Sequence, residues 1–170
     1  MAIDFFDTNE REASDIFSPS NSFENESTMV KYIEDHKEEF AQILCEGCQL
    51  IEYKREYKLL QRGKSMLRDI PNIRVDIALL LQYNGNMKWW YIEVKNPPHR
   101  TDLRNAIAQC MEYRLFSKED TEIVLVSSVY NKIIPMMIDE YKIPISVCFL
   151  NKEFFGFYKY NKEWSMPSRK

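Results

Sequence analysis

Two apolar segments joined by a tight-turn signal constrain the fold of this chain more than any other feature. Residues 73–81 and 88–95 each have the length and composition of a strand, and Asn84-Gly85 between them favours a two-residue hairpin turn. A Pro-Pro pair follows the second segment and would end a strand there. The sequence therefore predicts an antiparallel hairpin within a sheet.

Three charged side chains are expected on one face of this hairpin. In the first strand the aliphatic residues at the odd positions 73–81 should share one face, which puts Asp76 on the other. Glu93 and Lys95 likewise lie opposite the apolar face of the second strand. Asp76 precedes the turn by about as many residues as Glu93 follows it, so the hairpin register should bring the carboxylates together.

This grouping suits phosphodiester hydrolysis. Mg²⁺ binds one or two carboxylates together with water and phosphate oxygens, and a bound cation activates water for attack. An ammonium group nearby can orient that water or stabilise developing negative charge. A Glu-x-Lys pattern alone is also typical of a solvated strand face, but an Asp inside an apolar strand must be paired, exposed or bound to metal.

Further helices and strands are expected around the hairpin. Helices are predicted over residues 27–44, 102–116 and 132–141, and strands over 50–60, 122–129, 145–150 and 153–160. The order is helix, a meander of three strands, helix, strand, helix, strand. It predicts an α/β fold whose mixed central sheet is flanked by helices, with a strand–helix–strand crossover after the hairpin.

One domain with two loose ends is expected, since 170 residues suit a single hydrophobic core. Residues 1–25 are polar and acidic, which predicts a flexible N-terminal arm. Residues 26–163 would form the domain, and residues 164–170 a loose C-terminal tail. No apolar run approaches the ~20 residues that a membrane-spanning helix needs, so no membrane partner is expected.

The charge of the chain is unevenly distributed around a net value of -3. Basic residues gather in residues 54–74, where they could follow a phosphate backbone or form an ordinary solvated surface. The candidate substrate-binding residues are Lys54, Arg55, Arg62, Lys64, Arg68 and Arg74.

Asp76, followed after a hairpin by Glu93-Val94-Lys95, resembles the motif of the PD-(D/E)xK nuclease superfamily. Val75 stands where many members of that superfamily have proline. The resemblance covers roughly residues 26–150, and it implies a restriction-endonuclease-like core of αβββαβ order. It also implies that Asp76, Glu93 and the Val94 carbonyl bind Mg²⁺ or Mn²⁺, while Lys95 assists the attacking water.

A second match lies on the next predicted helix. Gln109 and Tyr113 are one helical turn apart and resemble the Gln-xxx-Tyr motif of RecB-type nucleases. The resemblance implies that this helical face lies over the metal site. There the amide and the hydroxyl group would contact the scissile strand or hold Lys95.

Members of the superfamily usually add a carboxylate from the first helix. Glu26 is favoured here, because its neighbours place it next to the apolar face of that helix. Glu34 and Glu39 on the same helix and Glu56 on the following strand remain open.

The four cysteines are not expected to carry chemistry. Some RecB-type relatives hold an iron–sulfur cluster on four cysteines, and Cys45 and Cys48 form a CxxC pair. Cys110 and Cys148, however, stand at apolar helix and strand positions that suit packing. We therefore expect no iron–sulfur cluster and a reducing, cytoplasmic location, which a viral or mobile-element protein in its host cell would share.

These features together predict a Mg²⁺- or Mn²⁺-dependent DNA nuclease. RNA as a substrate, exonuclease or endonuclease action, structure- or end-directed cutting and a homodimer all remain open. One alternative is a nucleic-acid-binding or assembly module that keeps the fold but does not cut. Another is a protein-interaction domain whose contact surface would be Trp89, Tyr91 and Tyr158.

Overall fold

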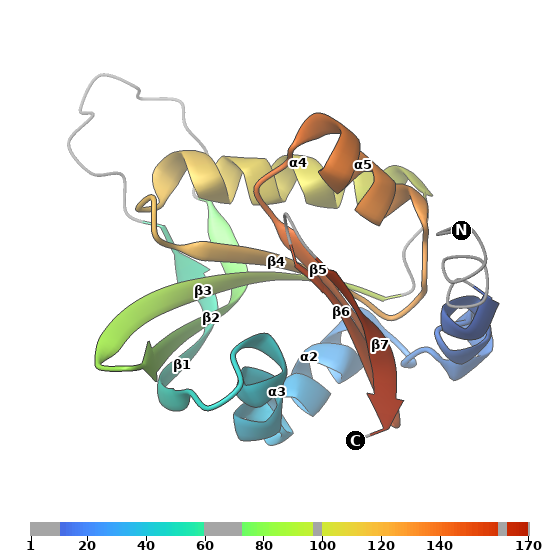
Figure 1. Ribbon diagram of the computed structural model, residues 1–170, viewed down its shortest axis with the longest axis horizontal. Helices are drawn as coiled ribbons and strands as arrows, with labels where there is room; N and C mark the ends of the chain where they lie inside the picture. The colour runs from blue at the N-terminus through green and yellow to red at the C-terminus, as the bar shows by residue number, and fades with distance from the viewer. Residues whose placement is uncertain (1–10, 60–72, 97–99, 160–162, 170) are drawn as a thin grey trace.

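A mixed seven-stranded sheet forms the centre of the protein and carries helices on both faces (Figure 1). The computed structural model describes residues 11–59, 73–96, 100–159 and 163–169, and the strands are counted over these ranges. The predicted α/β class, with a mixed sheet between helical layers, is confirmed.

The strands follow one another across the sheet in chain order. They are β1 (Gln49–Lys58), β2 (Arg74–Tyr83), β3 (Asn86–Lys95), β4 (Glu122–Ser127), β5 (Ser146–Leu150), β6 (Phe154–Lys159) and β7 (Glu163–Arg169). The first three form an antiparallel meander, β3, β4 and β5 are parallel, and β6 and β7 return antiparallel.

The helices divide between the two faces of the sheet (Figure 1). They are η1 (Pro19–Asn21, a 3-10 helix), α2 (Glu26–Asp35), α3 (Lys37–Leu44), α4 (Arg100–Phe116) and α5 (Ile133–Tyr141), and residues 11–16 are also helical. α2 and α3 cover one face, and α4 and α5 cover the other. No helix within the described ranges is long and apolar enough to cross a membrane.

Each face of the sheet has its own hydrophobic core. The α2-side core includes Ile77 and Ile92, packed with residues of α2 and α3. The α4-side core includes Tyr91, Leu125 and Tyr113, packed with residues of α4 and α5. The alternation expected for β3 is confirmed, because its odd and even positions contribute to opposite cores.

The predicted hairpin is present between β2 and β3. Asn84 and Gly85 both have a positive φ, 49° and 78°, as a two-residue turn of this kind requires. Ile77 pairs with Ile92, so the antiparallel register brings Asp76 level with Glu93.

The alternation of side chains breaks at one level of β1 and β2. Glu56 has a φ of 47°, a left-handed conformation that non-glycine residues adopt infrequently. Tyr53 packs against the α2-side core, whereas Tyr57, four residues later, packs against the α4-side core. In β2, Ile77 and Val75 also lie in opposite cores. The expectation that the odd positions of residues 73–81 share one face is therefore wrong at Val75.

The segment before α2 is packed, although a flexible arm was expected over residues 1–25. Ala13 and Phe17 are buried in the α4-side core, and Phe23 is buried in the α2-side core. The Asn96 side chain accepts a hydrogen bond from the Phe23 N–H at 3.0 Å and donates one to the Phe23 carbonyl at 2.9 Å. This pair of bonds holds the chain just before α2 beside the end of β3.

Two other expectations differ from the structure. The helix predicted over residues 27–44 is divided at His36, whose φ and ψ of -120° and 31° are not helical. Its N-cap is Asn25, whose side chain accepts a bond from the Thr28 N–H at 2.8 Å. The tail expected to be loose contains β7, paired with β6. Residues 1–10 of the arm, and the basic loop expected over residues 61–72, lie outside the described residues.

Asn96→Ala should lower the free energy of unfolding, because it leaves two buried backbone groups of Phe23 without partners. Each such group costs about 1–3 kcal/mol. Asn105→Ala, at an exposed position of α4, is the matched control and should change stability by no more than about 0.5 kcal/mol. Urea unfolding of both variants measures the difference, and equal midpoints would show that the Asn96 bonds do not hold this segment.

Candidate functional site

Asp76, Glu93 and Lys95 come together on the α4-side face, where β2 and β3 run side by side. Glu93 is 2% exposed, and its Oε1 lies 2.8 Å from the Lys95 Nζ. Asp76 is close enough to Glu93 for the two carboxyl groups to interact, and its Oδ2 accepts a hydrogen bond from the Val94 N–H at 2.8 Å. The three side chains grouped from the sequence are thus neighbours in the structure.

Tyr113 connects this group to α4. Its hydroxyl group donates a hydrogen bond to the Glu93 Oε2 and also lies 3.0 Å from the Arg74 carbonyl oxygen. Burial and the Glu93 carboxylate both raise the pKa of Tyr113, so the hydroxyl group keeps its proton and remains a donor. Gln109, one turn earlier on the same helix, is half-buried. Its expected contact with substrate or with Lys95 stays a prediction.

Glu26, in the first turn of α2, also lies near Asp76 and Lys95. Burial raises its pKa, and the charges of Lys95 and Asp76 act on it with opposite signs. The start of α2 is therefore near Lys95, where the bonds between Asn96 and Phe23 hold it.

The electrostatics of the site favour a bound cation. Burial, followed by the Glu93 carboxylate, raises the pKa of Asp76 to about 6. Burial would lower the pKa of Lys95, but the hydrogen bond to Glu93 and the negative charges of Glu93, Glu26 and Asp76 together outweigh this effect, so the pKa is raised. Lys95 is thus a permanent ammonium at neutral pH, and it faces more acidic groups than it can neutralise alone. A proton or a further cation would offset the excess negative charge.

The donor set fits a hard divalent cation with two carboxylate ligands. Within the described parts of the chain, no three His, Cys, Asp or Glu side chains converge closely enough to hold a metal ion. Asp76 and Glu93 form a close pair, Glu26 lies nearby, and its role as a further ligand stays a prediction. Mg²⁺ needs no more than one or two protein carboxylates. Each carboxylate oxygen has a second lone pair, so Glu93 can accept another contact.

The other acidic candidates are directed elsewhere. Glu34 forms ion pairs with Lys31 at 3.7 Å and with Arg55 at 3.5 Å. Glu39 belongs to α3, on the opposite face of the sheet, and Glu56 is exposed. None of the three approaches Asp76 in the way that Glu93 does.

Three of the six candidate basic residues lie in the part of the chain that the structure describes. Lys54 lies on β1 with its ammonium over aromatic rings, and Arg74 is exposed at the start of β2. Arg55 is paired with Glu34, so it does not face the site. The remaining candidates, Arg62, Lys64 and Arg68, lie outside the described residues.

Sequence reasoning missed Tyr57, which joins an aromatic cluster near the site. Its ring stacks on Trp89 at 5.4 Å between centroids and contacts Tyr91 at 5.9 Å. Regular alternation gave no signal, because the left-handed Glu56 turns Tyr57 to the α4-side face. The contact surface expected for a protein-interaction domain is wrong in two of its three residues, since Tyr91 and Tyr158 are buried.

The cysteines are not gathered at one place. Cys110 lies in the α4-side core, and Cys148 lies in the α2-side core on the other face of the sheet. Cys45 and Cys48 lie between α3 and β1. A single cluster could not bind all four without rearrangement of the sheet.

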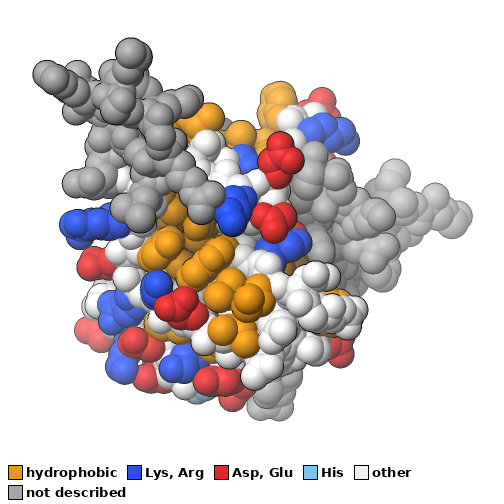
Figure 2. Space-filling model, turned by 90° about the vertical axis from the view of Figure 1, so that its left-hand side faces the viewer, with side chains coloured by type: hydrophobic (Ala, Val, Ile, Leu, Met, Phe, Trp, Pro, Cys, Tyr) orange, Lys and Arg blue, Asp and Glu red, His pale blue; other side chains and the backbone are white. Residues whose placement is uncertain are grey.

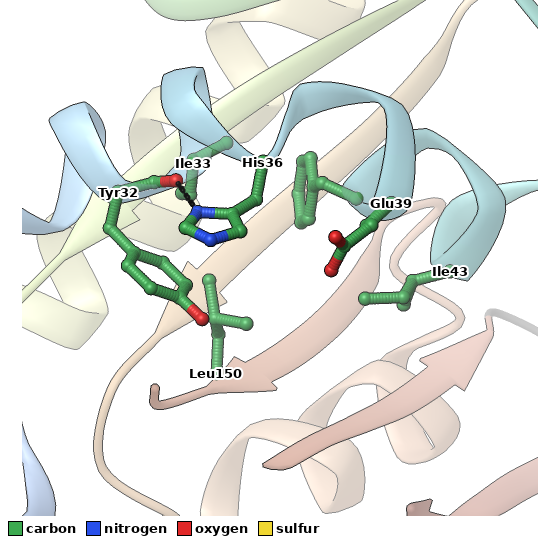
Figure 3. Close-up of a pocket in the computed structure, with 7 residues that line it drawn as sticks. Tyr32, Ile33, His36, Glu39, Ile43 and Leu150 are labelled. Atoms are coloured by element: carbon green, nitrogen blue, oxygen red, sulfur yellow. Dashed lines mark hydrogen bonds between the residues drawn. The ribbon is translucent and has the colours of Figure 1, made fainter. Parts of the chain in front are cut away.

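A small pocket on the α2-side face offers less chemistry than the acidic group. The rings of Tyr32 and His36 stack at 4.2 Å between centroids. Glu39 also lines the pocket, on the far side of His36 from Tyr32 (Figure 3). The His36 Nδ1 lies 2.9 Å from the Tyr32 carbonyl oxygen. The rest of the lining is apolar, and the sheet separates this pocket from Asp76 and Glu93.

Comparison with protein-family models, with curated proteins and with solved structures found no match to this chain. The fold and the site define an α/β protein with a half-buried aspartate, a buried glutamate, a lysine and a tyrosine, carried by two strands and a helix. Any function must be argued from this geometry.

The raised pKa of Asp76 predicts a pH dependence of stability in metal-free protein. Its ordinary value is 3.8 and its folded value about 6, so between these pH values the folded state holds a proton that the unfolded state has lost. The contribution of Asp76 to stability is therefore greatest below about pH 4 and is lost as the pH rises through about 6.

Asp76→Asn should remove this loss. Relative to the variant, wild-type protein should become less stable by roughly 1–3 kcal/mol between acid and neutral pH. Urea unfolding in EDTA across that range measures the difference between the two profiles. Parallel profiles would mean that Asp76 does not carry the proton.

Proposed function

We propose that this protein is a metal-dependent nuclease that hydrolyses phosphodiester bonds in DNA on a restriction-endonuclease-like core. The supporting observation is that Asp76 and Glu93 face each other on neighbouring strands with the Lys95 ammonium beside them. The order helix, three-stranded meander, helix, strand agrees with such a core.

Asp76 and Glu93, with the Val94 carbonyl oxygen, would hold Mg²⁺ or Mn²⁺. When bound, the ion lowers the pKa of a coordinated water and stabilises negative charge on the phosphate. Lys95 keeps its proton, so it acts as a donor that orients water or neutralises charge and not as a general base.

Tyr113 acts as a positioning residue in this proposal. It donates to one oxygen of Glu93 while Lys95 occupies the other, so the carboxylate has a fixed orientation. Gln109 lies on the same helix and would contact the strand that is cut. The pre-set carboxylate avoids reorganisation when the metal and the substrate arrive.

The contacts that Glu93 already makes within the protein favour a second candidate function, a module that binds nucleic acid without cutting it. Both oxygens of Glu93 already have protein partners, which would weaken a metal site if these contacts did not yield. The two functions differ in whether a divalent cation binds at Asp76 and Glu93.

Mg²⁺ or Mn²⁺ should raise the thermal midpoint of wild-type protein, because a cation that binds the folded state stabilises it by mass action. At a concentration 100 times the dissociation constant the gain is about 2.7 kcal/mol. Asp76→Asn should abolish the shift, and Asp120→Asn, at an exposed position, should keep it. An equal shift in both variants would place the cation elsewhere.

Purified protein should cut DNA with Mg²⁺ or Mn²⁺ but not with EDTA. Asp76→Asn and Lys95→Ala should each reduce the rate at least about 100-fold, because they remove a metal ligand and a charge at the reacting phosphate. The controls are Asp120→Asn and Lys132→Ala, both at exposed positions. The substrates are linear, circular, single-stranded and branched DNA, together with RNA.

The fold of each variant must be checked by circular dichroism, because Lys95→Ala leaves the buried Glu93 without its cation. A folded Lys95→Ala variant that cuts as fast as the Lys132→Ala control would remove Lys95 from the mechanism. Binding of DNA without cutting by wild-type protein in either metal would favour the non-catalytic module.

A further inference from the structure

A stack of aromatic rings lies on the same face of the sheet as the acidic pair. Tyr57 of β1 and Trp89 of β3 stack with an interplanar angle of 11°. Both side chains are half-buried, and the buried Tyr91 supports them from beneath at 5.9 and 6.3 Å. The side of the molecule where β1, β2 and β3 lie has hydrophobic side chains gathered beside charged ones (Figure 2).

A cation accompanies these rings. The Lys54 Nζ lies 5.2 Å from the Tyr57 ring centre and 5.6 Å from the Trp89 ring centre. The Lys54 side chain is 41% exposed and also pairs with Glu52 at 3.0 Å. Flat rings beside an exposed ammonium match the two parts of a nucleotide, since the base can stack and the phosphate can meet the charge.

Two of the aromatic rings lie on the same strand as Glu93 of the proposed metal site. Trp89, Tyr91 and Glu93 are alternate residues of β3, so their side chains share one face. A strand rises about 3.3 Å per residue, which places Trp89 and Tyr91 about 13 and 7 Å from Glu93 along β3. These spacings correspond to one or two nucleotides from a phosphate held at Glu93.

The left-handed backbone conformation of Glu56 in β1 is what places Tyr57 in the stack. The φ of 47° at Glu56 brings Tyr57 to the same face as Lys54, whereas regular alternation would have put it on the other. Strained conformations of this kind cost of order 1–3 kcal/mol and persist where the surrounding structure supports them.

We propose that Tyr57, Trp89 and Lys54 form a stacking platform for an unpaired segment of a nucleic-acid strand, next to the proposed cutting site. The inference rests on the proposed function for its placement of the scissile phosphate. The platform selects unpaired bases because the faces of a base within a duplex are already covered by its neighbours. Single-stranded or frayed DNA is therefore the substrate class that this face fits.

Three probes separate stacking from charge. They are a thymidine oligonucleotide of about 12 nucleotides, an abasic strand of the same length, and the corresponding duplex. Wild-type protein in EDTA should bind the thymidine strand more tightly than either of the others by fluorescence anisotropy. Equal affinity for the abasic strand would mean that phosphate contacts alone hold the ligand, and it would overturn the inference.

Substitutions then test the rings. Trp89→Leu and Tyr57→Leu should weaken binding of the thymidine strand about 5- to 100-fold and leave the abasic strand nearly unchanged. Trp89→Phe keeps a ring and should restore most of the affinity. Tyr141→Leu removes a tyrosine that is 70% exposed on α5, and it should bind as wild type does.

The outcomes distinguish the platform from the nuclease. Ring-dependent binding without any cutting supports the platform and rejects the proposed function. Cutting that proceeds equally in Trp89→Leu and Tyr141→Leu, with equal affinity for the thymidine strand, rejects the platform and leaves the nuclease standing. Absence of single-strand binding by wild-type protein also rejects the platform, and the rings would then be a packed surface or a protein contact.

Discussion

The two bonds to the Glu93 carboxylate are the interaction on which the site and its surroundings depend. Glu93 sits on a strand that pairs on both sides, with an exposed fraction of 2%, and an ionised carboxylate cannot remain there without partners. Lys95 supplies charge from the same strand, and Tyr113 supplies a proton donor from α4. The hydrogen bond from Tyr113 to Glu93 thus ties α4 to β3.

This coupling accounts for the uneven chemistry of the two faces of the sheet. On the α2-side face, Ile77 and Ile92 pack with other hydrophobic residues of the sheet and of α2 and α3, and the Glu34–Arg55 ion pair joins α2 to β1. On the α4-side face, Asp76 and Glu93 stand among apolar residues, and burial raises the pKa of Asp76 to about 6. A domain selected for stability alone gains little from this arrangement, since buried ion pairs are often no better than apolar residues of similar volume.

The sequence was informative where a local rule determines the structure and uninformative where packing does. The turn residues Asn84 and Gly85 predicted the hairpin, and its register then brought Asp76 to Glu93. Alternation failed at Tyr57, because the left-handed residue before it is a glutamate and not the glycine that would signal such a conformation. The acidic N-terminal segment was predicted to be a flexible arm, yet two buried phenylalanines anchor it, and its partner Asn96 is more than 70 residues away.

Glu56 and Asp76 occupy the same level of β1 and β2, as the pairs on either side of them show. The break in alternation therefore falls at the point where a carboxylate enters an apolar strand. It turns Val75 and Tyr57 toward the α4-side core, the face on which Asp76 and Glu93 come together. The same local geometry places the Tyr57 ring beside Lys54. If the proposed nuclease is correct, one irregularity in β1 helps to build both the site that holds the phosphate and the surface that holds the bases.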